Sequence, residues 1–189
     1  MKRVKKIKKM RYVIVDLEAT CWQKKSHPER KEIIEIGAVM MESEKWSIIG
    51  EFSEFVRPIN EPVLSDFFTE LTSIKQQDVD YVDEFGIVFG RFLDWIGNEP
   101  FYLCSWGKYD YRQFKIDCEM HGITFPKTFE RHINLKKDFS VLKGVPPCGM
   151  KKALYILEMP LKGTHHRGID DARNIAKIAR VVLPVMANE

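Results

Sequence analysis

Five residues in three separate segments carry side chains that can bind a divalent cation and move a proton: Asp16 and Glu18, Asp110, and the pair His166 and Asp171. Asp16 and Glu18 directly follow an apolar run, and alternation along a strand would place both side chains on one face. Two carboxylates held side by side repel each other unless a cation lies between them. We therefore expect a metal site where this first strand ends.

The chemistry that such a site supports is phosphodiester hydrolysis. Carboxylate oxygens are ligands that suit Mg²⁺ and Mn²⁺. Two such ions, about 3.5–4 Å apart, stabilise the attacking and the leaving oxygen of a phosphate together. His166 precedes Asp171 by five positions, and a histidine titrates in the range needed for a general base that takes a proton from water. The residues thus predict a two-metal nuclease.

The hydrophobic pattern predicts elements that can bring these residues together. We expect strands at residues 11–17, 32–41, 47–56, 101–105 and 133–135. The expected helices cover residues 65–71, 74–79, 83–96 (with Asp83 as N-cap), 109–121, 149–157 and 170–186. Three strands followed by alternating strands and helices are typical of an α/β layer with a mixed sheet. The ends of strands and the starts of helices converge at one sheet edge in such a layer.

Length and charge indicate one domain with a basic leader. At 189 residues the chain suits a single domain, and we assign residues 1–10 to a leader and 11–187 to the domain. The first eleven residues hold seven of the 30 Lys and Arg and no acid, so the remainder, with all 27 Asp and Glu, has a formal charge of about −4. A second basic cluster, at residues 131–152, is predicted to form a nucleic-acid backbone groove beside the site.

Several other classes of function are excluded by what the sequence lacks. There is no apolar run of the roughly 20 residues that span a bilayer, and the apolar stretch after the leader is too short for a signal peptide. We therefore expect a cytoplasmic protein without membrane contact. The four cysteines have no zinc-ligand spacing, and there is no phosphate loop or dinucleotide-binding turn.

The motifs resemble those of one nuclease family. The matching segments are DLEATC at residues 16–21, FVRPI at 55–59, ELT at 70–72, SW at 105–106 and HRGIDDARNIA at 166–176. The chain resembles the DEDDh 3′→5′ exonucleases, and within them the enhanced-RNAi and histone-mRNA exonuclease subgroup, which includes the bacterial KapD-like sporulation inhibitors. This resemblance implies a ribonuclease H-like fold, with a mixed five-stranded sheet flanked by helices. One departure is Ser73, where the family leads us to expect glycine.

The resemblance also implies roles for individual residues. Two Mg²⁺ or Mn²⁺ ions would be held by four carboxylates: Asp16, Glu18, Asp110 and Asp171. His166 would be the general base, and its spacing selects Asp171 over Asp170 and leaves His165 out of register. Glu18 would also contact the terminal nucleotide, whose sugar would lie beside the backbone of Leu17 to Ala19.

Three further side chains are candidates for substrate contact. Trp22 and Trp106 lie close to the acidic residues in sequence and can stack on a terminal base, and Met150 can contact a sugar or base. The alternative for all three is a place in the core, where large apolar side chains are usually found.

The function that these observations favour is release of nucleoside 5′-monophosphates from 3′ ends of single-stranded nucleic acid, with RNA more strongly indicated than DNA. The protein would act as a monomer or homodimer. Two alternatives remain at this stage. One is a regulatory, nucleic-acid-binding protein that keeps the fold without turnover, and the other is an endonuclease or transposase-type enzyme with similar carboxylates.

Overall fold

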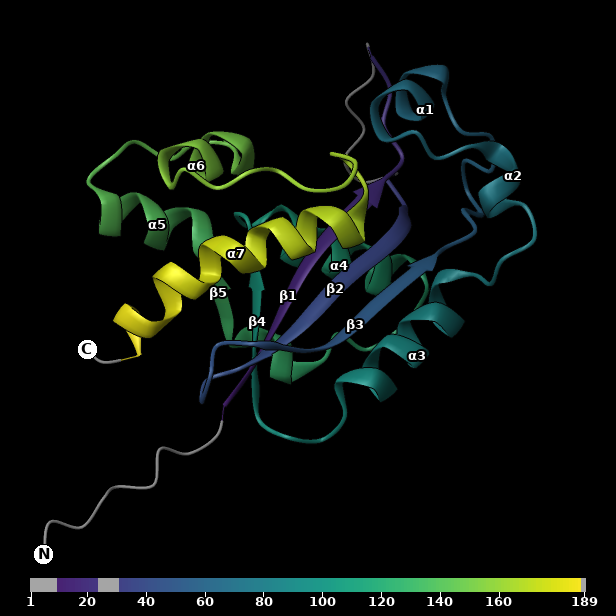
Figure 1. The fold of residues 1–189 in the computed structure, drawn as a ribbon. Coiled ribbons are helices and arrows are strands. Elements are labelled where there is room, and N and C mark those ends of the chain that lie inside the picture. The colour runs from purple at the N-terminus through teal and green to yellow at the C-terminus, as the bar shows by residue number, and fades with distance from the viewer. Residues whose placement is uncertain (1–9, 24–30, 188–189) are drawn as a thin grey trace, which may run out of the picture.

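A mixed five-stranded sheet forms the centre of the molecule (Figure 1). The computed structural model describes residues 10–23 and 31–187, so residues 1–9 of the predicted leader lie outside the described residues. The strands are β1 (Arg11–Ala19), β2 (Ile33–Glu42), β3 (Ile48–Phe55), β4 (Phe101–Ser105) and β5 (His132–Asn134). Their order is β3-β2-β1-β4-β5. Strand β2 runs antiparallel to both neighbours, whereas β1, β4 and β5 are parallel. The predicted sheet is thereby confirmed.

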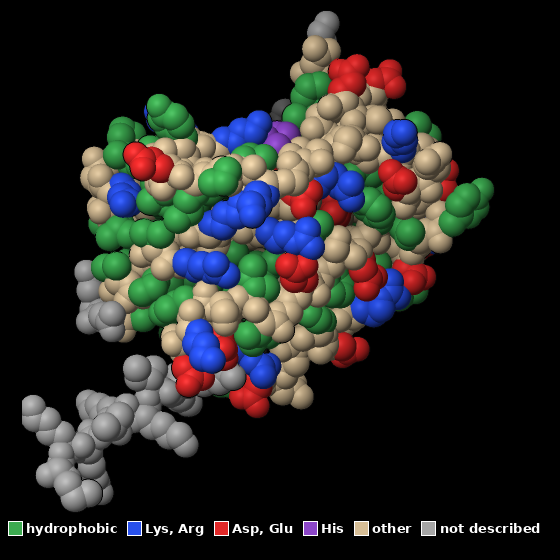
Figure 2. All heavy atoms as spheres, viewed as in Figure 1, with side chains coloured by type: hydrophobic (Ala, Val, Ile, Leu, Met, Phe, Trp, Pro, Cys, Tyr) green, Lys and Arg blue, Asp and Glu red, His purple; other side chains and the backbone are tan. Residues whose placement is uncertain are grey.

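Helices cover both faces of the sheet (Figure 1). One face packs against α3 (Phe85–Ile96) and α4 (Tyr109–Met120). The other packs against α5 (Leu135–Lys143), α6 (Met150–Ile156) and α7 (Gly168–Met186). Two short helices, α1 (Asp66–Thr72) and α2 (Gln76–Val79), lie beyond the end of β1, and a 3-10 turn covers Lys127–Glu130. Lys and Arg side chains gather on the surface over α7 (Figure 2).

The sequence of β1 explains how one strand serves two cores. Val13, Val15 and Leu17 pack on the side of α3 and α4. Tyr12 and Ile14 point the opposite way, toward α5 to α7. Because side chains alternate, Asp16 and Glu18 continue the row of Ile14 and face the start of α7. The strand is therefore apolar on both faces until its last residues, where one face becomes acidic.

One local prediction is wrong, and another is shifted by one residue. Helix α3 begins at Phe85 and its N-cap is Glu84, not Asp83. The Asp83 carboxylate instead pairs at 2.7 Å with Arg91, which lies about two turns into the helix. The strand expected at residues 133–135 is His132–Asn134, and the side chain of Asn134 then caps α5 by accepting a hydrogen bond from the amide of Lys137.

Ser73 occupies a position that favours glycine. It ends α1 with φ at 63°, in the left-handed region, and its amide donates to the carbonyl of Thr69. A left-handed residue commonly ends a helix, and glycine adopts it without steric cost. Ser73 thus adopts the left-handed conformation that glycine, the residue expected from the family pattern, would adopt more easily. None of the helices in the described part of the chain has the length and apolar character needed to cross a bilayer.

Candidate active site

Three elements bring four carboxylates to one end of the sheet. Asp16 and Glu18 come from the end of β1, Asp110 from the first turn of α4, and Asp171 from the first turn of α7. One ligand atom each of Asp16, Glu18 and Asp171 lies within 4.8 Å of the other two. Asp110 reaches β1 directly, since its Oδ1 accepts a hydrogen bond of 3.1 Å from the amide of Leu17. Asp110 and Asp171, which follow Asp16 in the sequence by 94 and 155 positions, thus lie near it in the fold.

A contact between two glycines places α7 against the sheet. Gly37 lies opposite Asp16 in the β1–β2 pair, and a Cβ on Gly37 would lie only 1.9 Å from the carbonyl carbon of Gly168. A Cβ on Gly168 would lie 2.9 Å from the carbonyl oxygen of Asp16. Backbone can approach backbone this closely only where both residues lack side chains. The start of α7 is therefore held against the acidic end of β1, and Asp171 lies in the first turn of this helix.

The electrostatics of the cluster favour a bound cation. Burial raises the pKa of Asp16 well above its ordinary value, and the neighbouring carboxylates, Asp110 first, raise it further. Burial also raises the pKa of Glu18 to about 8 and that of Asp110 to about 6. Oδ1 of Asp171 is buried and has no hydrogen-bond partner among the described residues. Buried polar atoms are normally satisfied, so a hard divalent cation fits this set of oxygen donors.

His166 and His165 both lie against Asp171. The amide of His166 donates to Asp171 Oδ2 at 2.9 Å, and Nδ1 of His165 lies 2.7 Å from the same oxygen. The two imidazole rings stack with centroids 3.9 Å apart. Burial and the neighbouring His165 lower the pKa of His166. Spacing along the sequence excluded His165. Its contact with Asp171 depends on the turn at His166, where φ is 63°, and residue spacing does not reveal such a turn.

Glu35 is a second residue that sequence reasoning missed. It is fully buried opposite Glu18 in the β1–β2 pair. Its carboxylate accepts hydrogen bonds from the amide of Gly168 at 3.0 Å and from Nε of Arg167 at 3.1 Å. Glu35 therefore fastens the start of α7 to β2. The only signal in the sequence was an acid at the centre of an apolar strand, which is costly unless it is paired.

A hollow of about 400 Å³ opens beside Glu18. It is lined by residues of the end of β1, α1, α4 and the segment after β1: Leu17, Glu18, Ala19, Cys21, Trp22, Lys31, Phe67, Leu71 and Tyr109. Leu17, Ala19 and Trp22, three of the predicted substrate contacts, thus line the same hollow. Trp106 and Met150 belong to the core between the sheet and α5 to α7, 9% and 6% exposed, and the indole of Trp106 donates to the carbonyl of Cys148. Their packing leaves little surface for a nucleotide.

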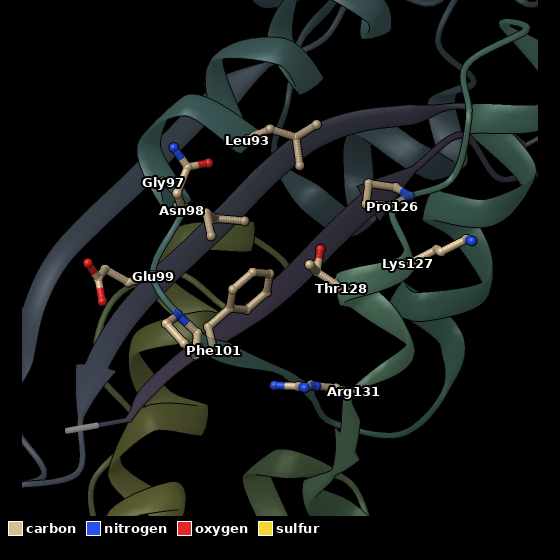
Figure 3. A pocket seen from close by; sticks show the side chains of 11 residues that line it. Leu93, Gly97, Asn98, Glu99, Phe101, Pro126, Lys127, Thr128 and Arg131 are labelled. Carbon is tan, nitrogen blue, oxygen red and sulfur yellow. The ribbon is translucent and has the colours of Figure 1, made fainter. Parts of the chain in front are cut away.

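The basic cluster at residues 131–152 is divided between two ends of the molecule. Lys136 lowers the pKa of Asp110 and Lys151 lowers that of His166, so both lie near the acidic site. Arg131 instead lines a hollow of about 570 Å³ at the start of β4, together with Lys127 and Phe101 (Figure 3). The start of β4 is opposite to the strand end that leads into α4. Residues 131–152 therefore do not form one continuous basic groove beside the acidic site, and this prediction is wrong.

The fold and the acidic cluster define a nuclease of the ribonuclease H-like class. A family model described as Exonuclease (RNase_T) matches residues 13–179. The human protein named 3'-5' exoribonuclease 1 is 33% identical over 175 residues, with 88% of this chain and 50% of that protein covered. The zebrafish (Danio rerio) protein named ERI1 exoribonuclease 2 is 31% identical over 189 residues, with 89% of this chain and 34% of that protein covered.

A solved structure shows the same fold. The nuclease domain of 3'hExo, a DEDDh family member bound to rAMP, superposes with a TM-score of 0.87 at 31% identity, covering 92% of this chain and 91% of that one. The chain therefore belongs to the DEDDh 3′→5′ exonuclease family. It spans only about a third or less of the length of the ERI1 exoribonuclease 2 proteins that it matches.

Proposed function

We propose that this protein is a metal-dependent 3′→5′ exonuclease that releases nucleoside 5′-monophosphates from single-stranded 3′ ends, RNA in preference to DNA. The observation that carries the proposal is the largely buried cluster of Asp16, Glu18 and Asp171, which Asp110 joins through β1, with an Asp171 oxygen that no described residue satisfies. Such a cluster is unfavourable in a binding protein, because burial and mutual repulsion raise the pKa values of its members. Relatives named exoribonucleases and a neighbour bound to rAMP support RNA as the substrate.

In this proposal Asp16, Glu18, Asp110 and Asp171 hold two Mg²⁺ or Mn²⁺ ions. The ions, when bound, supply positive charge for the attacking and leaving oxygens of the scissile phosphate. His166 accepts the proton of the attacking water, and its lowered pKa keeps the imidazole in the neutral form that can accept it. Glu35 and Arg167 position the start of α7, so that Asp171 and His166 stay in place.

The terminal nucleotide would occupy the hollow beside Glu18. Trp22 offers an aromatic face for the base, and a stacked base contributes roughly 1–3 kcal/mol. The backbone of Leu17 and Ala19 would lie along the sugar. Contact with the sugar is also where RNA and DNA differ, since only RNA carries a 2′-hydroxyl.

A cleavage assay on strands labelled at the 5′ end tests the proposal. Single-stranded RNA and the matching DNA are incubated with the protein in Mg²⁺, in Mn²⁺ and in chelator, beside the Asp16→Asn variant. We expect a metal-dependent ladder that shortens from the 3′ end, stronger on RNA and absent in the variant. The variant should also melt at a higher temperature than the parent in chelator, because one repelling carboxylate is gone.

The other outcomes of this assay distinguish the alternatives. Cleavage confined to internal positions would favour the endonuclease. Binding of RNA without cleavage in either metal would favour the regulatory protein. Undiminished cleavage by Asp16→Asn would remove Asp16 from the metal site.

A further inference from the structure

A charged hollow that contains none of the four carboxylates lies between α7 and β3. Its volume is about 470 Å³. Residues of β3, of the segment before α7 and of α7 itself line it: Ile48, Glu51, Lys162, Gly163, Asp170, Arg173, Lys177 and Arg180. Figure 2 shows basic side chains gathered over α7 on this face, with histidine at the upper edge. The basic surface is notable because the chain beyond its first eleven residues is acidic by formal charge.

Positive charge in this hollow exceeds what its acids neutralise. Arg173 is paired with both carboxylates of the hollow, Glu51 at 2.6 Å and Asp170 at 3.0 Å. Within the described part of the chain, Lys177 donates only to neutral oxygens, the carbonyl of Pro160 and the side chain of Asn174. Lys162 and Arg180 are exposed and make no ion pair with any described residue.

The cations of the hollow also lie close enough to repel one another. Burial first, and then the charge of Lys162, lower the pKa of Lys177. An ammonium group that has a second cation as its neighbour and only neutral hydrogen-bond acceptors is stabilised by an anion. Three cations, Lys162, Lys177 and Arg180, are therefore available to an anionic ligand.

The hollow and the acidic site share one wall. Asp170 and Asp171 are consecutive residues in the first turn of α7, so their side chains diverge by about 100° around the helix axis. Asp170 lines the hollow and accepts from the amide of Thr164, whereas Asp171 accepts from His165 and His166. The segment from Lys162 to Arg167 thus separates the two sites by the width of one loop.

We propose that Lys162, Lys177 and Arg180 bind the phosphodiester backbone of the RNA substrate upstream of its 3′ end. This inference rests on the proposed exonuclease function and extends it to the part of the strand that leaves the site. A long strand must pass from the acidic cluster to the surface, and a basic hollow one loop away offers its phosphates a place to bind. Contacts of this kind do not read sequence, and they weaken with added salt.

A pair of matched double variants tests the proposal. Lys162→Gln with Arg180→Gln removes two charges from this hollow and leaves the hydrogen bonds of Lys177 in place. Lys127→Gln with Arg131→Gln removes the same two residue types from the hollow at the start of β4 (Figure 3), and is the control for net charge. Each protein is assayed on a 30-nucleotide single-stranded RNA and on a trinucleotide, over a range of KCl concentrations.

We expect the α7 double variant to lose activity on the long RNA only. The slope of log(kcat/KM) against log salt is negative. Each lost phosphate contact on a single strand makes it less steep by about 0.7, so two lost contacts reduce its magnitude by about 1.4. The deficit of this variant on the long RNA should therefore shrink by about seven-fold between 50 and 200 mM KCl. Cleavage of the trinucleotide should stay unchanged, as should both activities of the control variant.

The proposal is overturned if the salt slope on the long RNA is unchanged, or if the control variant loses as much. It is also overturned if cleavage of the trinucleotide falls equally, because the hollow would then act on the active site itself. Fluorescence anisotropy of the labelled long RNA in chelator gives a second reading that needs no turnover. If the parent protein cleaves neither substrate, the proposed function fails, and loss of RNA affinity in the α7 variant alone still decides whether this surface binds the strand.

Discussion

Replacing Gly37 by alanine should separate α7 from the sheet and remove most of the activity. The added Cβ would lie 1.9 Å from the carbonyl carbon of Gly168 and 2.1 Å from the amide nitrogen of Ile169. Both are backbone atoms at the start of α7, so no side chain can rotate out of the way. The clash must be relieved by moving the helix start or the strand.

The size of the movement follows from these distances. Ordinary van der Waals contact begins near 3.4 Å, so the two backbones must separate by about 1.5 Å. Asp171 lies in the first turn of α7 and would move with it. A misplacement of about 1 Å at a catalytic centre costs roughly 100-fold in rate, so we expect Gly37→Ala to lower kcat by at least about 100-fold. Overpacking of this kind destabilises a protein by about 1–3 kcal/mol.

The assay pairs Gly37→Ala with a control at Gly90, in the middle of α3. A Cβ on Gly90 would meet no atom within 4 Å, so this variant should keep full activity and gain about 0.5–1 kcal/mol, as alanine replaces glycine within a helix. Urea unfolding gives the free energy of each variant, and metal-dependent RNA cleavage gives kcat.

A Gly37→Ala variant with activity within three-fold of the parent would refute the reasoning. The contact between Gly37 and Gly168 would then not determine where Asp171 lies. A variant that loses stability but no activity would show that the helix start shifts without carrying the carboxylate with it.

Two further predictions concern titrating side chains. His166→Ala should lower kcat by roughly 10²–10⁴ while Mn²⁺ affinity, measured by calorimetry, is retained, and a collapse of that affinity would make His166 a ligand instead. Burial raises the pKa of Asp117 from 3.8 to about 7. The folded state therefore holds this proton more tightly than the unfolded chain, and the stability of the parent should fall between about pH 4 and pH 7, by at most roughly 4 kcal/mol from this residue. Asp117→Asn should flatten that part of the curve of unfolding free energy against pH, and an unchanged slope would show that Asp117 is ionised throughout.

Local patterns in the sequence were sufficient for most of the elements. The apolar positions expected in residues 83–96, Phe85, Val88, Phe89, Phe92 and Ile96, are the residues that α3 buries. Helix α5 was missed, although Asn134 and the spacing of Leu135 and Phe139 indicate a capped helix. Leu135 was instead assigned to the short strand that precedes this helix. The N-cap of α3 was misplaced because Asp83 is a good capping residue locally, yet its carboxylate forms an ion pair with Arg91, eight residues further along the chain.

Residue types and their spacing along the chain were sufficient to find the acidic pair on β1, to select Asp110 and Asp171, and to indicate the family. What holds these residues together became visible only in the folded molecule. The approach of Gly37 to Gly168, the anchoring of α7 by Glu35 and the contact of His165 with Asp171 join residues that are distant in sequence or related through an unusual turn. Such contacts depend on how β2 and α7 pack, and packing between elements leaves no periodic signal in a single sequence.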